Sequence, residues 1–572
     1  MTRSEPFAFV RDLATRWDLI AAIVVIGLLV FAAEASHGLL EPLAQLNATP
    51  LSLDPANLPF YAARTTLRMF AGLFVSMIFT LTYATWAAKS PRAEKLLIPI
   101  LDILQSVPIL GFLSVTVVFF MSLAPGRVLG AEFAAIFAIF TSQAWNMAFS
   151  FYQSLRTIPY ELCEAADSYH LTPWMRFWQL EVPFGLPALI WNVMMSMAGG
   201  WFFVVLAEFV TVGQTTFALP GIGSYIARAS EQGDLHAIGW AILAMFLVII
   251  VCDQLIFRPL VVWVDRFRVE QEPGTWLPQS WALTMMRRSR IVAGLTASFY
   301  ACVRWTSWAL PREKKIIPRL PQAVNRRMDA LWFALLLVVI LWALWKIGVV
   351  LIANTSLSEL GHVCALACLT MIRVFLLISL ASLIWVPIGV KVGLNPRAAE
   401  FVQPIAQFLA AFPNNLLFPL AVLGISMWKL NPDLWLSPLM ILGTQWYILF
   451  NVIAGATTIP TELRYAADNF QVSGWLWWKR VGLPAVFPFY VTGAITASGG
   501  SWNAAVLAEL ACWKGKCVQA HGIGAYIQDA TTAGDFHRII LGVVVMCLFV
   551  IVINRVLWRP LYYFAERKYR LT

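Results

Sequence analysis

Apolar and polar residues alternate along this chain in long blocks, with apolar runs of about twenty residues divided by short polar segments. A helix needs roughly twenty apolar residues to cross the hydrocarbon core of a bilayer. In the first half we expect such spans at residues 19–35, 66–88, 96–121, 132–152, 187–211 and 237–257. The second half repeats them at residues 330–353, 365–392, 402–427, 434–452, 488–511 and 538–556. The pattern predicts an all-α polytopic membrane protein with about twelve transmembrane helices.

The first apolar run has two interpretations. It follows Arg11 and Arg16 and ends in Ala33-Glu34-Ala35, which is typical of the cleavage site of a secretory signal peptide. We prefer an anchored first helix, because the second half has an equivalent span at residues 330–353.

The two halves repeat one another. Placing Pro159 on Pro460 also places Ala165-Ala166-Asp167 on Ala466-Ala467-Asp468, Pro183 on Pro484, Ala207-Glu208 on Ala508-Glu509, and Gly221-Ile222-Gly223 on Gly522-Ile523-Gly524. Such self-similarity indicates a duplicated unit. We therefore divide the chain into a first unit at 1–260, a basic linker at 261–328 and a second unit at 329–572. Units that run in the same direction imply a pseudo-two-fold axis along the membrane normal, and a pathway would lie on that axis.

One polar, Trp-rich segment interrupts the spans of each unit, at residues 161–187 and 462–488. In the first copy we expect two short helices, one starting near Tyr160 and one after Thr172-Pro173, with a bend around His170. The aromatic residues beside the bend could fill a groove in a partner or sit in the lipid interface, where Trp is enriched. We prefer the partner, because lipid would not require the repeated Ala-Ala-Asp turn.

These segments resemble the cytoplasmic loop of permease subunits of bacterial ABC importers, which reads E-A-A, three residues, Gly, nine residues, Ile-x-Leu-Pro. Glu164-Ala165-Ala166 is followed at that spacing by His170 in the Gly position and by Leu180-Glu181-Val182-Pro183. The second copy has Tyr465-Ala466-Ala467, Gln471 in the Gly position and Val481-Gly482-Leu483-Pro484. Both copies thus lack the Gly, and the second also lacks the leading Glu. The resemblance covers residues 60–260 and 365–561 and is closest to permeases of the nitrate/sulfonate/taurine type.

The resemblance implies two six-helix units of the type I ABC importer fold, fused in tandem, with coupling loops at about 153–187 and 453–488. It also implies two ABC ATPase subunits, or a homodimer of them, that hold ATP and Mg, and a periplasmic or lipid-anchored solute-binding protein. This chain itself would need no cofactor. The solute would be a small anion such as nitrate, a sulfonate, taurine or bicarbonate. The residues that would meet the ATPases are Glu164, Ala165, Ala166, Asp167, His170 and Pro183, with Ala466, Ala467, Asp468, Gln471 and Pro484.

Composition agrees with a membrane protein, because 60% of the residues are hydrophobic and only 13% are charged. The net charge of +10 would suit a nucleic-acid partner, but the Lys and Arg residues lie in short loops between spans, as the positive-inside rule requires. We therefore expect a lipid bilayer and no nucleic acid as partner. The eight Cys show no metal-ligand spacing. His362, Cys364 and Cys368 come nearest to a cluster, and we interpret them as packing residues.

The basic loops predict an orientation in a bacterial inner membrane. Both termini and both Trp-rich loops would face the cytoplasm, where Lys89, Arg156, Lys391, Arg464 and Lys568 collect. The linker is also basic, and its apolar stretch 291–310 is better explained as an interfacial helix than as a thirteenth span. A thirteenth span would turn the two loops to opposite sides of the membrane.

Three functions are compatible with these features. The first is the channel-forming part of an ATP-driven importer, with a separate motor, since the chain has no G-x-x-x-x-G-K-[ST] phosphate loop. The second is a transporter driven by an ion gradient, which usually places ionisable groups at mid-membrane. The third is a membrane-embedded enzyme, for which Asp234 with His236 and Asp535 with His537 are candidates, although a helix N-cap explains these aspartates more simply. We prefer the first, a transport subunit that is not an enzyme.

Two features are expected on the outer side. Cys512 and Cys517 would face an oxidising compartment and could close a small loop by a disulfide. Arg68 and Arg373 occupy matching positions in the outer half of the bilayer, where an unpaired Arg is costly. Either they form ion pairs with Glu208 and Glu509, or they attract an anion on its pathway with their forked donors. The sequence leaves both roles open.

Overall fold

The structure, a computed structural model, describes residues 51–264 except 107–108 and 213–214, residues 356–569, and scattered residues between 265 and 355. The predictions of a first span at 19–35 and of an interfacial helix in the linker lie outside the described residues, as does much of the predicted span at 330–353. All other predicted spans can be compared with the structure.

The first unit contains five hydrophobic helical spans within the described residues. They are α3 (Leu58–Lys89), α4 (Pro91–Ser106) followed by α5 (Ile109–Leu123), α6 (Val128–Arg156), α9 (Val182–Ala207) and α11 (Leu235–Cys252), which continues through a π-helical turn (Asp253–Phe257) into α12 (Arg258–Val264). α3, α6 and α9 pack side by side and form the centre of the unit. Most buried side chains of the unit are apolar, and a small set of buried polar and charged groups lies among them.

The second unit repeats this order. Its spans are α16 (Leu357–Gly393), α17 (Pro396–Ala411) with α18 (Phe418–Met427), α19 (Pro432–Trp435) and α20 (Ser437–Ile441) with α21 (Gln445–Thr457), α24 (Leu483–Ala508) and α26 (Phe536–Ile553), which runs through a π-helical turn (Asn554–Trp558) into α27 (Arg559–Tyr569). α16, α21 and α24 correspond to α3, α6 and α9 in their mutual packing. The predicted all-α architecture of two repeated units is confirmed.

Two spans that were predicted as continuous helices are interrupted, both in the second unit. There α17 and α18 meet at an angle of 72°, and the helices before and after residues 442–444 meet at 42°. Pro413 has no backbone N–H to continue α17, and a short 3-10 turn (Asn414–Leu417) begins after it. Counting only described residues, seven helices are long and apolar enough to cross a membrane, or nine if each bent pair is one span.

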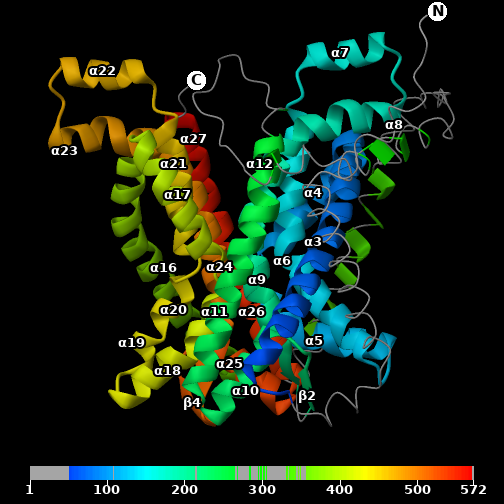
Figure 1. Ribbon diagram of the computed structural model, residues 1–572, viewed down its shortest axis with the longest axis vertical. Coiled ribbons are helices and arrows are strands. Elements are labelled where there is room, and N and C mark those ends of the chain that lie inside the picture. Colours follow the sequence, from blue (N-terminus) through cyan, green and yellow to red (C-terminus); the bar gives the residue numbers. More distant parts are fainter. Residues whose placement is uncertain are drawn as a thin grey trace, which may run out of the picture.

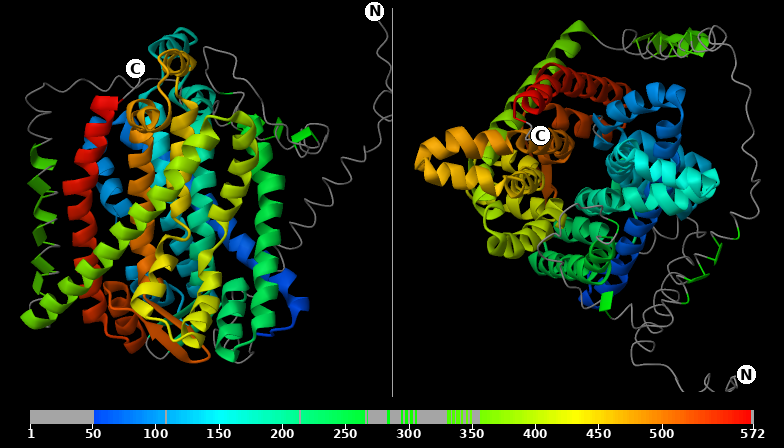
Figure 2. Two further views of the ribbon diagram at one scale, coloured as in Figure 1. Left: turned by 90° about the vertical axis from the view of Figure 1, so that its left-hand side faces the viewer. Right: turned by 90° about the horizontal axis from the view of Figure 1, so that it is seen from above.

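The two units contact each other in a reciprocal way. The last span of each unit packs against the second span of the other: α11 against α17, and α26 against α4 and α5. The rings of Phe246 and Phe408 meet in the first of these contacts, with centroids 4.6 Å apart. Seen from above, the units lie on either side of a common centre (Figure 2). This arrangement agrees with a pseudo-two-fold axis along the helices.

The two ends of the molecule differ. One end carries two helical hairpins, α7 (Tyr160–Ser168) with α8 (Pro173–Arg176) and α22 (Thr461–Asn469) with α23 (Gly474–Trp477), which both project from the bundle (Figure 1). The other end carries two β-hairpins, β1 (Phe209–Val212) with β2 (Thr215–Ala218) and β3 (Leu510–Trp513) with β4 (Lys516–Gln519), each followed by a short helix, α10 (Ile222–Gln232) or α25 (Ile523–Ala533). The repeated polar segments therefore share one side of the bundle.

Candidate functional site

The two helical hairpins have the same backbone course. In the first, Thr172 caps α8, its hydroxyl accepting a hydrogen bond from Met175 N at 3.3 Å, and His170 adopts a left-handed conformation with φ 51°. In the second, Gln471 has φ 54°. The two short helices and the bend expected at His170 are confirmed. The bend needs one residue with a left-handed backbone conformation, which Gly adopts most easily. His170 and Gln471 occupy the Gly position of the family motif and adopt this conformation.

The alanines and the acidic residues of the hairpins face different ways. Ala166 and Ala467 are buried, and their carbonyls accept from Leu171 N and Val472 N at 3.1 and 2.8 Å, which closes each bend. Glu164, Ala165 and Asp167 are exposed in the first hairpin, as is Asp468 in the second, whereas Ala466, Pro183 and Pro484 are half-buried. The alanines at the centre of the motif thus hold the hairpin together, and the side chains around them form its outer face.

Large aromatic side chains also stand on this outer face. Tyr169 and Phe470, which occupy equivalent positions, are each 81% exposed. Tyr160, Tyr465 and Trp475 are exposed as well, whereas Trp174, Trp477 and Trp478 are half-buried. Exposed aromatic residues beside charged ones are characteristic of protein interfaces.

A buried ionic cluster lies near the opposite end of the first unit. Arg68 of α3 binds both oxygens of Glu132 at 2.6 Å and donates to Glu208 Oε1 at 2.8 Å. Thr65 donates to the same Glu208 oxygen at 2.7 Å, and Gly223 N donates to Oε2 at 2.7 Å. Glu208 caps α9, so the cluster ties α3, α6, α9 and the start of α10 together. The forked donors of Arg68 are filled by protein acceptors.

The second unit has the same cluster in a more open form. Arg373 donates to Glu509 at 3.2 Å and to Asp433 at 2.6 Å, while Thr370 and Gly524 N donate to Glu509. The Arg373 side chain is 13% exposed, against 5% for Arg68, and its partner Asp433 is 36% exposed. Of the two roles left open for these arginines, the structure shows the ion pair.

Two members of this cluster escaped the sequence analysis. Glu132 begins one predicted apolar span and Asp433 immediately precedes another, and the same alignment that matches the Ala-Ala-Asp turns also places Glu132 on Asp433. A carboxylate at matching positions of two apolar spans was the signal that could have identified them, because an intramembrane charge is rarely kept without a partner.

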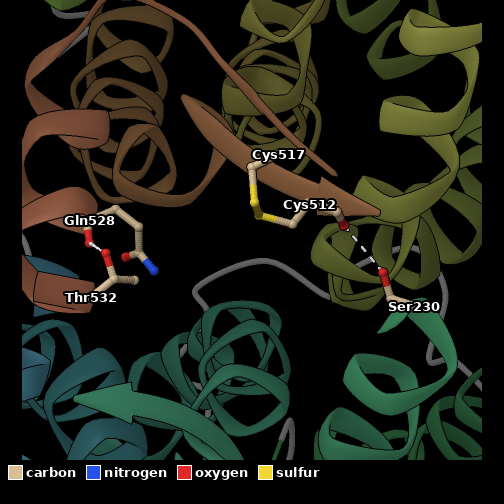
Figure 3. The surroundings of a disulfide bond; sticks show 5 residues. All are labelled: Ser230, Cys512, Cys517, Gln528 and Thr532. Atoms are coloured by element: carbon tan, nitrogen blue, oxygen red, sulfur yellow. Dashed lines mark hydrogen bonds between the residues drawn. A yellow bond between two sulfur atoms is a disulfide. The ribbon is translucent and has the colours of Figure 1, made fainter. Parts of the chain in front are cut away.

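The β-hairpin of the second unit connects the two units at the end of the bundle opposite the helical hairpins (Figure 3). Cys512 and Cys517 are joined by a disulfide across the paired strands. Lys514 N donates to Ser230 O at 3.0 Å. The Ser230 hydroxyl donates to Cys512 O at 3.2 Å (Figure 3). Ser230 belongs to α10 of the first unit, so the cross-linked hairpin is docked on the other half of the molecule.

The bend of the second unit brings uncharged polar groups to the boundary between the units. Asn415 follows the break between α17 and α18 and is buried, and its amide donates to Phe202 O of α9 at 3.4 Å. Its Oδ1 has no hydrogen-bond partner among the described residues. Asn414 lies against Gly443, where the next span is bent. Broken helices between repeats are where transporters usually place their solutes.

No group of His, Cys, Asp and Glu in the described part of the chain has the arrangement of a metal site. The cysteines considered with His362 are separate free thiols, Cys364 half-buried and Cys368 exposed. Asp234 and Asp535 cap α11 and α26, each accepting from the backbone N–H groups two and three residues ahead. The cap is thus the observed role of both aspartates.

Comparison with known proteins agrees with this architecture. The family described as "Binding-protein-dependent transport system inner membrane component" matches twice, at residues 72–266 and 384–569. Similar proteins include a bicarbonate transport system permease protein of Synechococcus elongatus, 30% identical over 29% of this chain and 56% of that protein. A glycine betaine/carnitine transport permease protein of Listeria monocytogenes is 26% identical over 35% and 66%. A nitrate import permease protein of Leptolyngbya laminosa is 28% identical over 31% and 59%.

The matched stretch covers between about half and two thirds of each of these relatives. The family model, in contrast, covers most of the chain and finds both units in the places where the duplication predicts them. The relatives are named as transport permeases and not as enzymes. With its apolar spans, repeated units and paired helical hairpins, this chain belongs to the binding-protein-dependent transport system inner membrane component family as a tandem fusion of two permease units.

Proposed function

We propose that this chain forms the translocation pathway of an ATP-driven importer and that its two helical hairpins each seat on one ATP-binding subunit. The observation that carries the proposal is the pair of hairpins at one end of the bundle, with equal backbone geometry and exposed aromatic side chains at equivalent positions. A protein driven by an ion gradient has no need of two matched docking elements. The ATPases would supply ATP and Mg, and this chain would move in response.

The proposal includes an orientation and partners. The hairpins and both termini lie in the cytoplasm of a bacterial cell, and the β-hairpins face outward, where a solute-binding protein delivers the solute. Glu164, Asp167 and Tyr169 form the docking face of the first hairpin, with Tyr465, Asp468 and Phe470 in the second. Ala165, Ala166, Ala466 and Ala467 shape these faces, and Pro183 and Pro484 begin the helices that lead from them into the membrane.

The solute is a small anion. The support comes from relatives named for bicarbonate and nitrate. A small zwitterion is the second candidate, because another relative is named for glycine betaine and carnitine. Since Arg68 and Arg373 are held by carboxylates, we assign solute contact to uncharged groups at the bends of the second unit, Asn414 and Asn415.

Exposed side chains offer the sharpest test, because their replacement leaves the hairpins folded. Tyr169→Ser combined with Phe470→Ser is expected to lower retention of the ATPase by the purified chain and to abolish ATP-dependent uptake. Trp428→Ser is the matched control, since Trp428 is 74% exposed and follows α18 at the opposite end of the molecule. Full ATPase retention and uptake in the double variant would contradict the proposal.

A further inference from the structure

A second set of ion pairs lies at the inner end of the first unit, around Glu181. This residue sits in a π-helical turn (Phe177–Glu181) that joins the first helical hairpin to α9. Its side chain is 6% exposed and pairs with Lys89 Nζ at 2.8 Å and with Arg176 Nε at 3.5 Å. Arg176 also reaches Asp167 at 3.6 Å. Charged contacts thus lead from Asp167, on the exposed face of the hairpin, to Lys89 at the end of α3.

The pair between Lys89 and Glu181 has a counterpart at the other end of the same two helices. α3 carries Arg68 near one end and Lys89 at the other, about 30 Å apart at 1.5 Å per residue. The segment containing α9 runs antiparallel to it, from Glu181 to Glu208. At one end Arg68 pairs with Glu208, and at the other end Lys89 pairs with Glu181. The distance is 2.8 Å in each pair. α3 and α9 are therefore clamped together at top and bottom.

Among its described residues, the second unit has only one of these clamps. Its outer clamp is present, because Arg373 of α16 pairs with Glu509 at the end of α24. At the inner end, the positions of Lys89, Arg176 and Glu181 are taken by Leu394, Trp477 and Gly482. The Trp477 ring lies against Gly482, so close that a Cβ at this glycine would be 2.5 Å from it. Apolar packing replaces the ionic contacts of the first unit.

We propose that Lys89 and Glu181 are positioning residues that make α3 and α9 move as one body with the first helical hairpin, whereas the second unit is free to flex at its inner end. The inference rests on the proposed function, since it requires that the hairpins receive the motion of the ATPases. Displacement of the first hairpin moves both helices and, through Arg68 and Glu208, the β-hairpin side. The two units thus respond unequally to a symmetric motor. The ratio of solute moved to ATP hydrolysed depends on the inner clamp of the first unit.

The test uses the full transport complex, reconstituted with its ATPase in lipid vesicles, with nitrate as the solute that is measured. Lys89→Gln and Glu181→Gln are each expected to keep the ATPase bound and hydrolysing ATP, while the solute moved per ATP falls about tenfold, a usual size for coupling between sites. Because the two residues act through one contact, the double variant should also fall about tenfold and no further. Lys391→Gln, which removes an exposed cation from the last turn of α16 in the second unit, should leave the ratio unchanged.

Two results would overturn the inference. One is an unchanged ratio in both single variants, and the other is a multiplicative loss in the double variant, which would mean that the residues act separately. Thermal unfolding and ATPase retention are measured on the same samples, so a variant that merely misfolds is recognised by loss of the bound ATPase. If the unaltered chain itself binds no ATPase, the proposed function fails, and this outcome is distinct from the loss of coupling in a fully assembled complex.

Discussion

Replacing Arg68 tests the ionic cluster of the first unit most severely. Arg68→Gln removes the cation that faces Glu132 and Glu208, whose side chains are 8% and 0% exposed. Two carboxylates then remain in an apolar bundle without a positive partner. Breaking a buried pair by removing one member costs about 3–5 kcal/mol, so we expect the variant to lose most of its folded population in membranes.

The equivalent change in the second unit should be milder. Arg373 is more exposed, and Asp433 keeps a hydrogen bond from His521 N at 2.7 Å and reaches solvent. Only Glu509 is left fully buried, and it still accepts from Thr370 and Gly524 N. We therefore expect Arg373→Gln to lower the free energy of unfolding less than Arg68→Gln does. The difference should be roughly 1–2 kcal/mol, because one buried carboxylate loses its cation instead of two.

The assay is thermal unfolding of the purified chain in detergent, with its monodispersity as a second readout. Neutralising the stranded acids, in the triple variant Arg68→Gln, Glu132→Gln and Glu208→Gln, should recover most of the lost stability, because replacing every charge removes the uncompensated burial. A stable, monodisperse Arg68→Gln variant that fails only in uptake would refute this reasoning. It would assign Arg68 to the solute pathway.

Three further predictions follow from local geometry. Cys512→Ser with Cys517→Ser should make the β3–β4 hairpin sensitive to protease and cost roughly 2 kcal/mol, because the disulfide closes its loop. Cys302→Ser, at a free thiol, should change nothing, and equal protease resistance of the double variant would contradict the role of the disulfide. Gly522→Ala should lower the stability of the chain by about 1–3 kcal/mol, because the new Cβ would lie 2.1 Å from the Glu509 carboxylate. Gly499→Ala is the control, because its Cβ would meet no atom within 4 Å. Equal melting temperatures of the two variants would contradict this prediction. His170→Gly should slow hydrogen exchange at the bend by relieving about 1 kcal/mol of left-handed strain, and faster exchange would show that the imidazole itself supports the bend.

The sequence contained the architecture because its strongest signals are periodic and repeated. Apolar length alone located the spans of both units within the described residues, and the Thr172-Pro173 start signal with the bend at His170 located the first helical hairpin. The breaks near Asn414 and Gly443 could not be read in the same way, since the hydropathy of each run continues across them.

The ionic contacts depended on long-range packing and were harder to foresee. Arg68 and Glu208 could be paired because both stood out in apolar surroundings, but Glu132 was passed over as the edge of a span. Lys89 and Glu181 look like ordinary loop charges in the sequence. Their contact depends on the packing of α3 against α9, which brings the end of α3 beside the start of α9.

The energy source of transport tests the central claim most directly. Membrane vesicles that contain the full complex, with the helical hairpins facing the lumen, are loaded with ATP or left without it, and uptake of a small anion is measured with and without an imposed proton or sodium gradient. Our account predicts that uptake requires luminal ATP, persists when the gradients are collapsed, and is lost in the Tyr169→Ser, Phe470→Ser double variant. Uptake driven by a gradient in vesicles free of ATP would contradict it.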